Sequence, residues 1–164
     1  MTELQLIQLA ETIVGKLRAS NKTLGLAESC TGGWLSKIIT DVSGASAIYN
    51  GGICSYSNTV KMKLLGVKEE TLALYGAVSE QTAREMAIGA REALGSDIGV
   101  GITGIAGPLS DNTQKSVGLI YVAVAFNNTV TVKQLNNNFT DDVRLNNRLS
   151  AVETALRLLG DINE

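Results

Sequence analysis

The chain has 164 residues, 45% of them hydrophobic and 18% charged, a length and composition typical of one globular domain, here residues 1–164. The formal net charge is −2 and no basic run occurs, so the sequence lacks the electrostatic signature of a protein that binds nucleic acid or an anionic membrane surface. No apolar run is long enough to cross a bilayer, which disfavours an integral membrane protein.

The first part of the chain alternates between helical and extended patterns. The spacing of apolar residues predicts a helix over residues 3–19, a strand over 23–28 and a helix over 31–41. The next segment, residues 45–56, is apolar and rich in small side chains. The glycine pair 51–52 inside it indicates a strand with a bulge or a close backbone approach.

Three helices are expected after this strand. They cover residues 58–65, closed by Gly66, then 68–75, and finally a longer segment that Ser79 caps and that runs to Leu94.

The second half of the chain is richer in strands. A strand over 97–103 leads into the glycine-rich loop 104–108 and the polar, irregular segment 109–116. After these come strands over 117–126 and 129–135, joined as a hairpin by Asn127-Asn128, and an amphipathic helix over 141–159. Because helices alternate with strands while the hairpin is antiparallel, the sequence predicts an α/β fold with a mixed sheet and helices on both faces.

Three loops that directly follow apolar strands carry groups that can do chemistry: residues 28–33, 56–61 and 103–108. Since the carboxyl ends of strands in open α/β sheets converge on the ligand crevice, we expect these loops to build one site. The chain has no histidine, so a nucleophile there needs another base. A lysine desolvated to a lower pKa can act as that base, and the sequence offers Lys61 for the hydroxyl of Ser29.

Neighbouring groups extend this hypothesis. Lys63 is a rival to Lys61, but a helix turns it roughly 200° away. Tyr56 is expected to orient the lysine or to shuttle a proton, and the N–H groups after Ser29, at a helix N-terminus, to form an oxyanion hole. If the pair is catalytic, Lys61 Nζ should lie within hydrogen-bond reach of Ser29 Oγ, and a separation far beyond ~3 Å would count against catalysis.

Each of these residues also has a purely structural interpretation. Ser29 would then cap the following helix, Lys61 would be a solvated helix lysine, and Glu28 would be a carboxylate that accepts backbone N–H groups. Gly104 and Gly107 would form turns without a ligand.

The two cysteines, Cys30 and Cys54, have neither the density of a disulfide scaffold nor the spacing of a zinc site. Together with an acidic N-terminus unlike a signal peptide, they predict a cytoplasmic protein. Cys30 is a rival nucleophile, because a helix N-terminus lowers the pKa of a thiol. Since neighbouring side chains in a turn point in different directions, we expect instead that Cys30 is buried and unreactive.

Several motifs occur in a fixed order along nearly the whole chain, from about residue 5 to 159. They are Ala27-Glu28-Ser29-Cys30-Thr31-Gly32-Gly33, Tyr49-x-Gly51-Gly52, Tyr56-Ser57-Asn58-x-x-Lys61, Leu64-Leu65-Gly66-Val67, Gly76-Ala77-Val78-Ser79 and Val100-x-x-Thr103-Gly104-Ile105-Ala106-Gly107-Pro108. This series resembles the CinA C-terminal domain family, whose characterised members are nicotinamide-nucleotide amidases.

The resemblance implies a three-layer α/β/α sandwich with a mixed, mostly parallel sheet, in a domain that often forms a homodimer. It implies hydrolysis of a small-molecule nucleotide, nicotinamide mononucleotide, to nicotinate mononucleotide and ammonia, with no metal or redox cofactor. On the matching positions Ser29 is the nucleophile, Lys61 is the general base and Tyr56 assists. The implied substrate-binding positions are Thr31, Gly32 and Gly33, which would bind phosphate or stabilise the oxyanion, and Thr103 and Gly104, which would line the site.

The chain departs from the family pattern in two places. Residues 109–116 replace a glycine-rich stretch, and lost glycines remove close backbone approach to a ligand. In the last helix the two arginines of the family motif are displaced by one position, about 100° around the helix, and Arg144 is the one expected to reach the substrate. The second hypothesis is therefore a catalytically weak or inactive paralogue that binds a nucleotide-like ligand, or an enzyme that acts on another amide.

Overall fold

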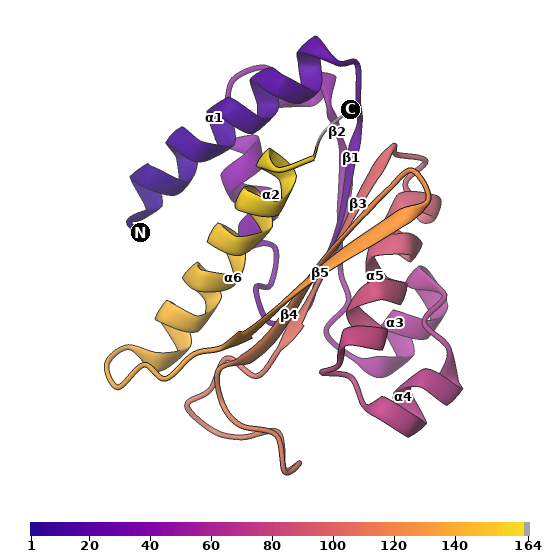
Figure 1. Ribbon diagram of the computed structural model, residues 1–164, viewed down its shortest axis with the longest axis vertical. Coiled ribbons are helices and arrows are strands. Elements are labelled where there is room, and N and C mark those ends of the chain that lie inside the picture. The colour runs from indigo at the N-terminus through magenta and orange to yellow at the C-terminus, as the bar shows by residue number, and fades with distance from the viewer. Residues whose placement is uncertain (163–164) are drawn as a thin grey trace.

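The computed structural model, which describes residues 1–162, has three layers: a central sheet with helices on both of its faces (Figure 1). Its five strands lie in the order β2 (Tyr49–Cys54), β1 (Leu24–Glu28), β3 (Ile98–Gly104), β4 (Leu119–Phe126) and β5 (Thr129–Asn136). β1 pairs in parallel with β2 and β3, whereas β4 is antiparallel to both β3 and β5, so β4 alone runs against the other strands. The predicted α/β class and the mixed, mostly parallel sheet in three layers are confirmed.

Within residues 1–162, the six α-helices divide evenly between the two faces of the sheet. One face carries α1 (Glu3–Ala19), α2 (Trp34–Thr40) and α6 (Val143–Gly160), and the other carries α3 (Asn58–Leu65), α4 (Glu69–Tyr75) and α5 (Glu80–Ala93) (Figure 1). Local signals set their ends. The Ser79 side chain caps α5 by accepting the N–H of Thr82, and Gly66 ends α3 with a left-handed φ of 68°. Both predicted signals are confirmed.

The helix expected over residues 31–41 begins later than predicted, at Trp34. Gly32 and Gly33 have φ angles of 60° and 90°, a left-handed backbone that cannot belong to a right-handed helix. The glycine pair therefore forms a turn between β1 and α2 instead of the first turn of the helix.

The strand expected over residues 45–56 is also shorter in the structure. Residues Ala45–Ala47 form a short 3-10 helix, and only Tyr49–Cys54 join the sheet. The predicted bulge is confirmed, because the pairing register of the two neighbouring strands shifts between Leu24 and Gly25. The remaining elements agree with the predicted ones to within two residues at each end.

Helix α5 lies very close to the sheet because β3 presents glycines to it. A Cβ atom at Gly99 would lie 2.0 Å from the carbonyl oxygen of Ala87, and one at Gly101 would lie 2.5 Å from that of Ala83. The backbone of α5 therefore rests directly on β3, while large apolar side chains of α1 and α6 pack on the opposite face. Held from both sides, β3 gives Thr103 at its carboxyl end a fixed position.

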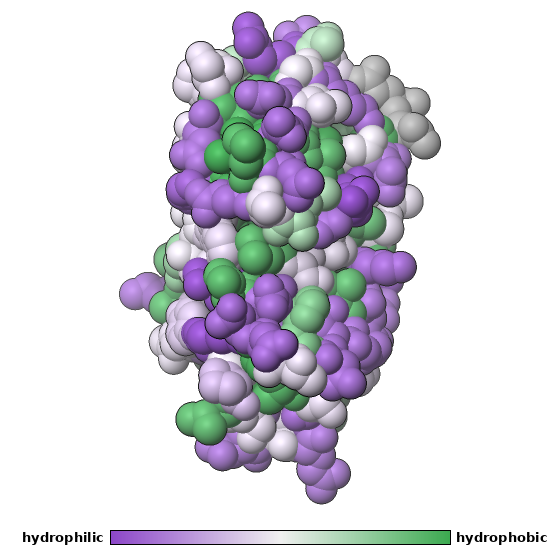
Figure 2. All heavy atoms as spheres, turned by 90° about the vertical axis from the view of Figure 1, so that its left-hand side faces the viewer, coloured by the Kyte–Doolittle hydropathy of each residue, from purple (hydrophilic) through white to green (hydrophobic). Residues whose placement is uncertain are grey.

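The face built from α1, α2 and α6 is polar over most of its area, and its apolar residues occur in separate places (Figure 2). Within residues 1–162, none of the helices combines the length and the apolar composition that a membrane crossing requires.

Candidate active site

A cavity of about 260 Å³ opens where the carboxyl ends of the parallel strands β1 and β3 meet the segment after β2. The three predicted loops thus converge, as expected for strand ends in an open α/β sheet. Six of the predicted site residues line the cavity: Ser29, Tyr56, Lys61, Thr103, Gly104 and Arg144. The structure therefore brings the predicted nucleophile, base and assisting tyrosine to one place.

Ser29 is presented by the tight turn that follows β1. Its N–H donates to the carbonyl of Ile102 in β3 (3.1 Å), and its own carbonyl accepts the N–H of Gly32 (3.0 Å). Both bonds fix the backbone on either side of the side chain. Ser29 is 9% exposed, so its hydroxyl lies at the floor of the cavity rather than on the surface.

Three predicted substrate-binding residues, Thr31, Gly32 and Gly33, do not line this cavity. Thr31 is fully buried, and the two glycines line a separate, open hollow beside Trp34 and Arg148. In the structure these three residues form the turn that presents Ser29. Their direct contact with substrate stays a prediction.

Glu28, immediately before Ser29, caps helix α2. Its buried carboxylate accepts the N–H of Leu35 (3.1 Å) and both the N–H (2.8 Å) and the hydroxyl (2.7 Å) of Ser36. The residue at the N-cap position, Gly33, has no side chain to offer. A carboxylate at this end also interacts favourably with the helix dipole. The capping alternative for Ser29 is therefore wrong, and the structural interpretation of Glu28 is confirmed.

Lys61 is almost completely buried, with 1% of its surface exposed, so the solvated alternative is wrong. Its Nζ lies 3.2 Å from Ser29 Oγ, within the predicted reach. The same atom donates to the carbonyls of Ser55 (2.6 Å) and Tyr56 (3.4 Å). Burial lowers the pKa of Lys61 below the usual value for a lysine, because the charged form loses its hydration. Lys63, the rival on the same helix, is exposed.

Tyr56 stands at the mouth of the cavity, 65% exposed, and contacts the lysine through its main chain. Its hydroxyl accepts a hydrogen bond from Arg144 Nη2 (3.1 Å), while Arg144 Nη1 donates to the carbonyl of Gly107 (2.9 Å). Arg144 thereby links the segment after β2 with the loop after β3. The carbonyl of Tyr56 contacts Lys61 while its hydroxyl pairs with Arg144, so a role in orienting the lysine or shuttling a proton stays a prediction.

Thr103 is buried at the end of β3, and its hydroxyl donates to the carbonyl of Ala77 (2.7 Å). This bond holds the segment before α5 against the cavity, where Ala77 is one of the lining residues. Thr103 therefore shapes the wall of the cavity, and Gly104 continues its floor.

The sequence analysis missed two residues that hold this site together. Buried Asn147 donates from Nδ2 to the carbonyl of Ala106 (3.0 Å) and accepts at Oδ1 from Asn137 (3.1 Å), which ties the loop after β3 to α6. Asn147 could have been found from the sequence, because it is a polar residue on the apolar face of the last helix, four positions before Ala151. Lys115 is the second, and it donates to carbonyls of the segment before α5.

The rival nucleophile Cys30 is buried, as predicted. Burial raises the pKa of its thiol to about 11, which outweighs the lowering by its own N–H group and by nearby Arg148. The thiol therefore stays protonated near neutral pH, where a thiolate would be needed for attack. Helix α2 does not activate it.

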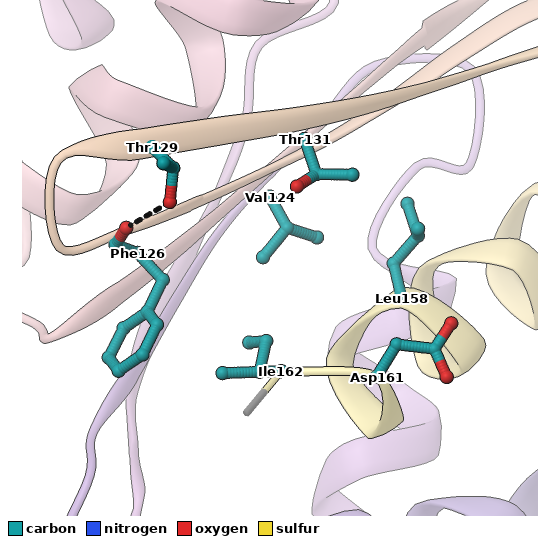
Figure 3. Close-up of a pocket in the computed structure, with 7 residues that line it drawn as sticks. All are labelled: Val124, Phe126, Thr129, Thr131, Leu158, Asp161 and Ile162. Atoms are coloured by element: carbon teal, nitrogen blue, oxygen red, sulfur yellow. Dashed lines mark hydrogen bonds between the residues drawn. The ribbon is translucent and has the colours of Figure 1, made fainter. Parts of the chain in front are cut away.

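A second, slightly larger cavity of about 310 Å³ lies at the opposite end of the sheet, between the β4–β5 hairpin and the end of α6 (Figure 3). Val124, Phe126, Leu158 and Ile162 are the apolar residues that line it, and Asp161 is the one charged lining residue within residues 1–162. No lysine is among the residues described as lining it. Within the described part of the chain, no group of three or more His, Cys, Asp or Glu side chains is placed to hold a metal ion.

Fold and site together define a class of protein: a three-layer α/β domain whose strand ends bring a serine hydroxyl into contact with a buried lysine. Residues 6–162 match the model of the CinA C-terminal domain, and the chain belongs to that family.

Relatives of the chain come in two lengths. The nicotinamide-nucleotide amidohydrolase PncC of Escherichia coli strain K12 is 49% identical over 125 residues, which is 76% of this chain and 76% of that protein. A CinA-like protein of Desulfovibrio desulfuricans is 51% identical over 127 residues, 77% of this chain and 30% of that protein. The chain thus spans about three tenths of the length of the longer relatives that it matches.

Solved structures share the whole architecture. The competence/damage inducible protein CihA from Agrobacterium tumefaciens superposes with a TM-score of 0.92 at 36% identity, covering 100% of this chain and 98% of that chain. A CinA superfamily protein from Escherichia coli gives a TM-score of 0.87 at 31% identity, covering 94% of this chain and 88% of that chain.

Proposed function

We propose that this chain is an amide hydrolase that converts nicotinamide mononucleotide and water to nicotinate mononucleotide and ammonia. The observation that carries the proposal is the 3.2 Å contact between Ser29 Oγ and Lys61 Nζ inside a cavity at the strand ends. The name of the Escherichia coli relative, a nicotinamide-nucleotide amidohydrolase, supports the choice of substrate.

The surroundings of Lys61 suit a neutral amine that acts as a base. A neutral amine has two N–H donors and one lone pair. In the structure Lys61 Nζ donates to these two carbonyls, of Ser55 and Tyr56, and to Ser29 Oγ. Once the amine loses a proton, its two remaining N–H groups can keep the carbonyls, and its lone pair can accept the hydroxyl proton of Ser29. The lowered pKa of Lys61 increases the fraction of this neutral form at a given pH.

In the first half of the reaction, Ser29 Oγ attacks the carboxamide carbon while its proton passes to Lys61 Nζ. The oxyanion of the tetrahedral intermediate needs N–H donors, and those of Cys30 and Thr31 follow the nucleophile on the same turn. The N–H groups of Ser29 and Gly32 already donate to Ile102 and to Ser29 itself. Lys61 then gives its proton to the leaving nitrogen, the C–N bond breaks, and ammonia departs from an acyl ester on Ser29.

In the second half, a water molecule attacks the acyl ester and transfers a proton to Lys61. The new tetrahedral intermediate collapses, the ester bond breaks, and Lys61 returns the proton to Ser29 Oγ. The acid product leaves, and the site is restored. Arg144, beside Tyr56 at the mouth of the cavity, is placed to attract the phosphate of the nucleotide.

One observation favours a second candidate, a relative that binds a nucleotide-like ligand without turnover. Leu109, Ser110 and Asp111 line the cavity where the family has glycines. The carboxylate of Asp111 has the same sign of charge as a phosphate and opposes its approach, against the attraction of Arg144. Calorimetry with nicotinamide mononucleotide separates the candidates: heat of binding without release of ammonia supports the second one.

To test the enzymatic proposal, the purified protein is incubated with nicotinamide mononucleotide, and ammonia and nicotinate mononucleotide are both measured. The two products are expected in equal amounts. Ser29→Ala and Lys61→Met are each expected to lower kcat at least about a hundredfold. Lys63→Met is the matched control, since it removes an exposed lysine from the same helix and should leave kcat unchanged. Full activity of Ser29→Ala would exclude the proposed nucleophile.

A further inference from the structure

The segment of residues 75–78, between α4 and α5, forms one wall of the candidate active site, where Ala77 and Val78 line the cavity. Side chains from other elements hold each of its carbonyl groups. Tyr75 O accepts from Lys115 Nζ (2.6 Å), Gly76 O from the hydroxyls of Ser79 (3.1 Å) and Thr82 (2.8 Å), Ala77 O from Thr103 (2.7 Å), and Val78 O from Lys115 Nζ (2.5 Å). The wall is therefore fixed from α5, from β3 and from the loop that contains Lys115.

The loop of residues 109–116 supplies another wall of the same cavity, through Leu109, Ser110 and Asp111. A relay of hydrogen bonds joins this end of the loop to Lys115. Asp111 Oδ1 accepts the N–H (3.1 Å) and the hydroxyl (2.5 Å) of Thr113, and the Thr113 hydroxyl accepts the N–H of Lys115 (3.1 Å). A displacement of Lys115 would thus pass through Thr113 to a residue that lines the cavity.

The ammonium group of Lys115 is well suited to this junction. Tyr75 is the last residue of α4, and a cation at a helix C-terminus interacts favourably with the helix dipole and the final carbonyls. Gly76, with a left-handed φ of 80°, allows the two carbonyls to converge. A Cβ atom there would lie 3.1 Å from Lys115 Nζ, so a larger residue would crowd the ammonium group.

We propose that Lys115 is a positioning residue that joins residues 75–78 and 109–116 into one rigid rim and thereby determines substrate affinity. The inference rests on the proposed function, because it assigns the rim to substrate binding. Lys115 contacts the wall, whereas Ser29 and Lys61 contact each other on the floor of the cavity. Its loss should therefore weaken binding of substrate and transition state alike, which raises KM and leaves kcat unchanged.

Four variants test this proposal. Lys115→Met keeps the length of the side chain but removes its donors, and Lys115→Arg keeps a cation with donors for two carbonyls. Thr113→Val breaks the relay in an exposed part of the loop without touching Lys115. Lys133→Met, in an exposed position on β5, is the control for removal of a lysine.

Amide hydrogen exchange measured by mass spectrometry needs no substrate and tests the mechanical link directly. In Lys115→Met, exchange should become faster in residues 75–78 and 109–116 together, while Lys115→Arg and Lys133→Met keep the wild-type pattern. Thr113→Val should loosen only 109–116. Unchanged exchange in Lys115→Met, or faster exchange in one segment alone, would overturn the proposal.

Steady-state kinetics with nicotinamide mononucleotide tests the consequence for binding. We expect KM of Lys115→Met to rise about tenfold, with kcat within about twofold of wild type and largely restored KM in Lys115→Arg. An equal fall in kcat and kcat/KM, or no rescue by arginine, would contradict a positioning role. Absence of turnover in the wild-type protein refutes the proposed function, and the exchange experiment then decides on the rim alone.

Discussion

Replacing Glu28 with glutamine tests whether the carboxylate before the candidate nucleophile caps α2. In the wild-type protein, Oε1 accepts two bonds from Ser36, and Oε2 accepts the buried N–H of Leu35. A glutamine keeps one acceptor oxygen and turns its NH₂ group toward the other donor. One buried N–H then loses its acceptor, which costs about 1–3 kcal/mol, and loss of the charge at the helix N-terminus adds about 0.3–1 kcal/mol.

Glu28→Gln should therefore lower the free energy of unfolding by about 1–4 kcal/mol, which corresponds to a fall in Tm of roughly 2–16 °C for a chain of this length. Urea unfolding followed by fluorescence measures this well, because the one tryptophan of the chain, Trp34, is the first residue of α2. Ser29→Ala is the matched control. It removes no cap and loses only the contact with Lys61, so it should cost about 1 kcal/mol. A larger loss in Ser29→Ala than in Glu28→Gln would refute the reasoning.

Three further predictions concern the candidate active site. The pKa of Lys61 is lowered, and only its neutral amine can accept a proton. The value of kcat/KM for nicotinamide mononucleotide should therefore rise as the pH increases through that lowered pKa. A kcat/KM that falls over this pH range would contradict Lys61 as the base. Asn147→Ala removes the side chain that donates to the carbonyl of Ala106. It should lower the free energy of unfolding in urea by about 1–3 kcal/mol and also lower kcat/KM. An unchanged urea midpoint would show that this hydrogen bond does not contribute to stability. Burial raises the pKa of the Cys30 thiol to about 11 and shields it from reagents, whereas Cys54, whose pKa is also raised, is exposed. Iodoacetamide at neutral pH should therefore label Cys54 first, as peptide mass spectrometry can measure, and equal labelling of both would disprove the protection of Cys30.

Most helices and strands were predictable because their signals are local. The cap at Ser79, the stop at Gly66 and the turn at Asn127-Asn128 each act within a few residues of the chain. The start of α2 was not predictable in the same way. Gly33 fits either a helix or a left-handed turn, and the choice depends on Glu28, whose carboxylate reaches α2 from the end of β1.

The absence of histidine and the convergence of strand ends suggested the pairing of Ser29 with Lys61 as one of several alternatives, and the resemblance to the CinA C-terminal domain family selected it. The supporting contacts could not be found that way. Lys115 and Asn147 bond main-chain carbonyls that lie 40 and 41 residues away in sequence, and Lys61 turns back to carbonyls of the segment before its own helix. Since every residue carries a carbonyl group, its orientation leaves no mark in the residue types, and such contacts become visible only in three dimensions.

Glu28 and Ser29 show how one local pattern produces two separate functions. Successive side chains of extended backbone point to opposite faces of a sheet, and Glu28 is the last residue of β1. Its carboxylate meets α2 on one face, while the Ser29 hydroxyl meets Lys61 of α3, which lies on the other face (Figure 1). A shift of the strand by one residue would turn each of the two side chains to the other face and place a carboxylate against the buried amine of Lys61. That charge would raise the pKa of Lys61 and remove the lone pair that the proposed chemistry needs. The order of glutamate and serine at the strand end thus stabilises α2 and, at the same time, keeps the carboxylate away from the proposed base.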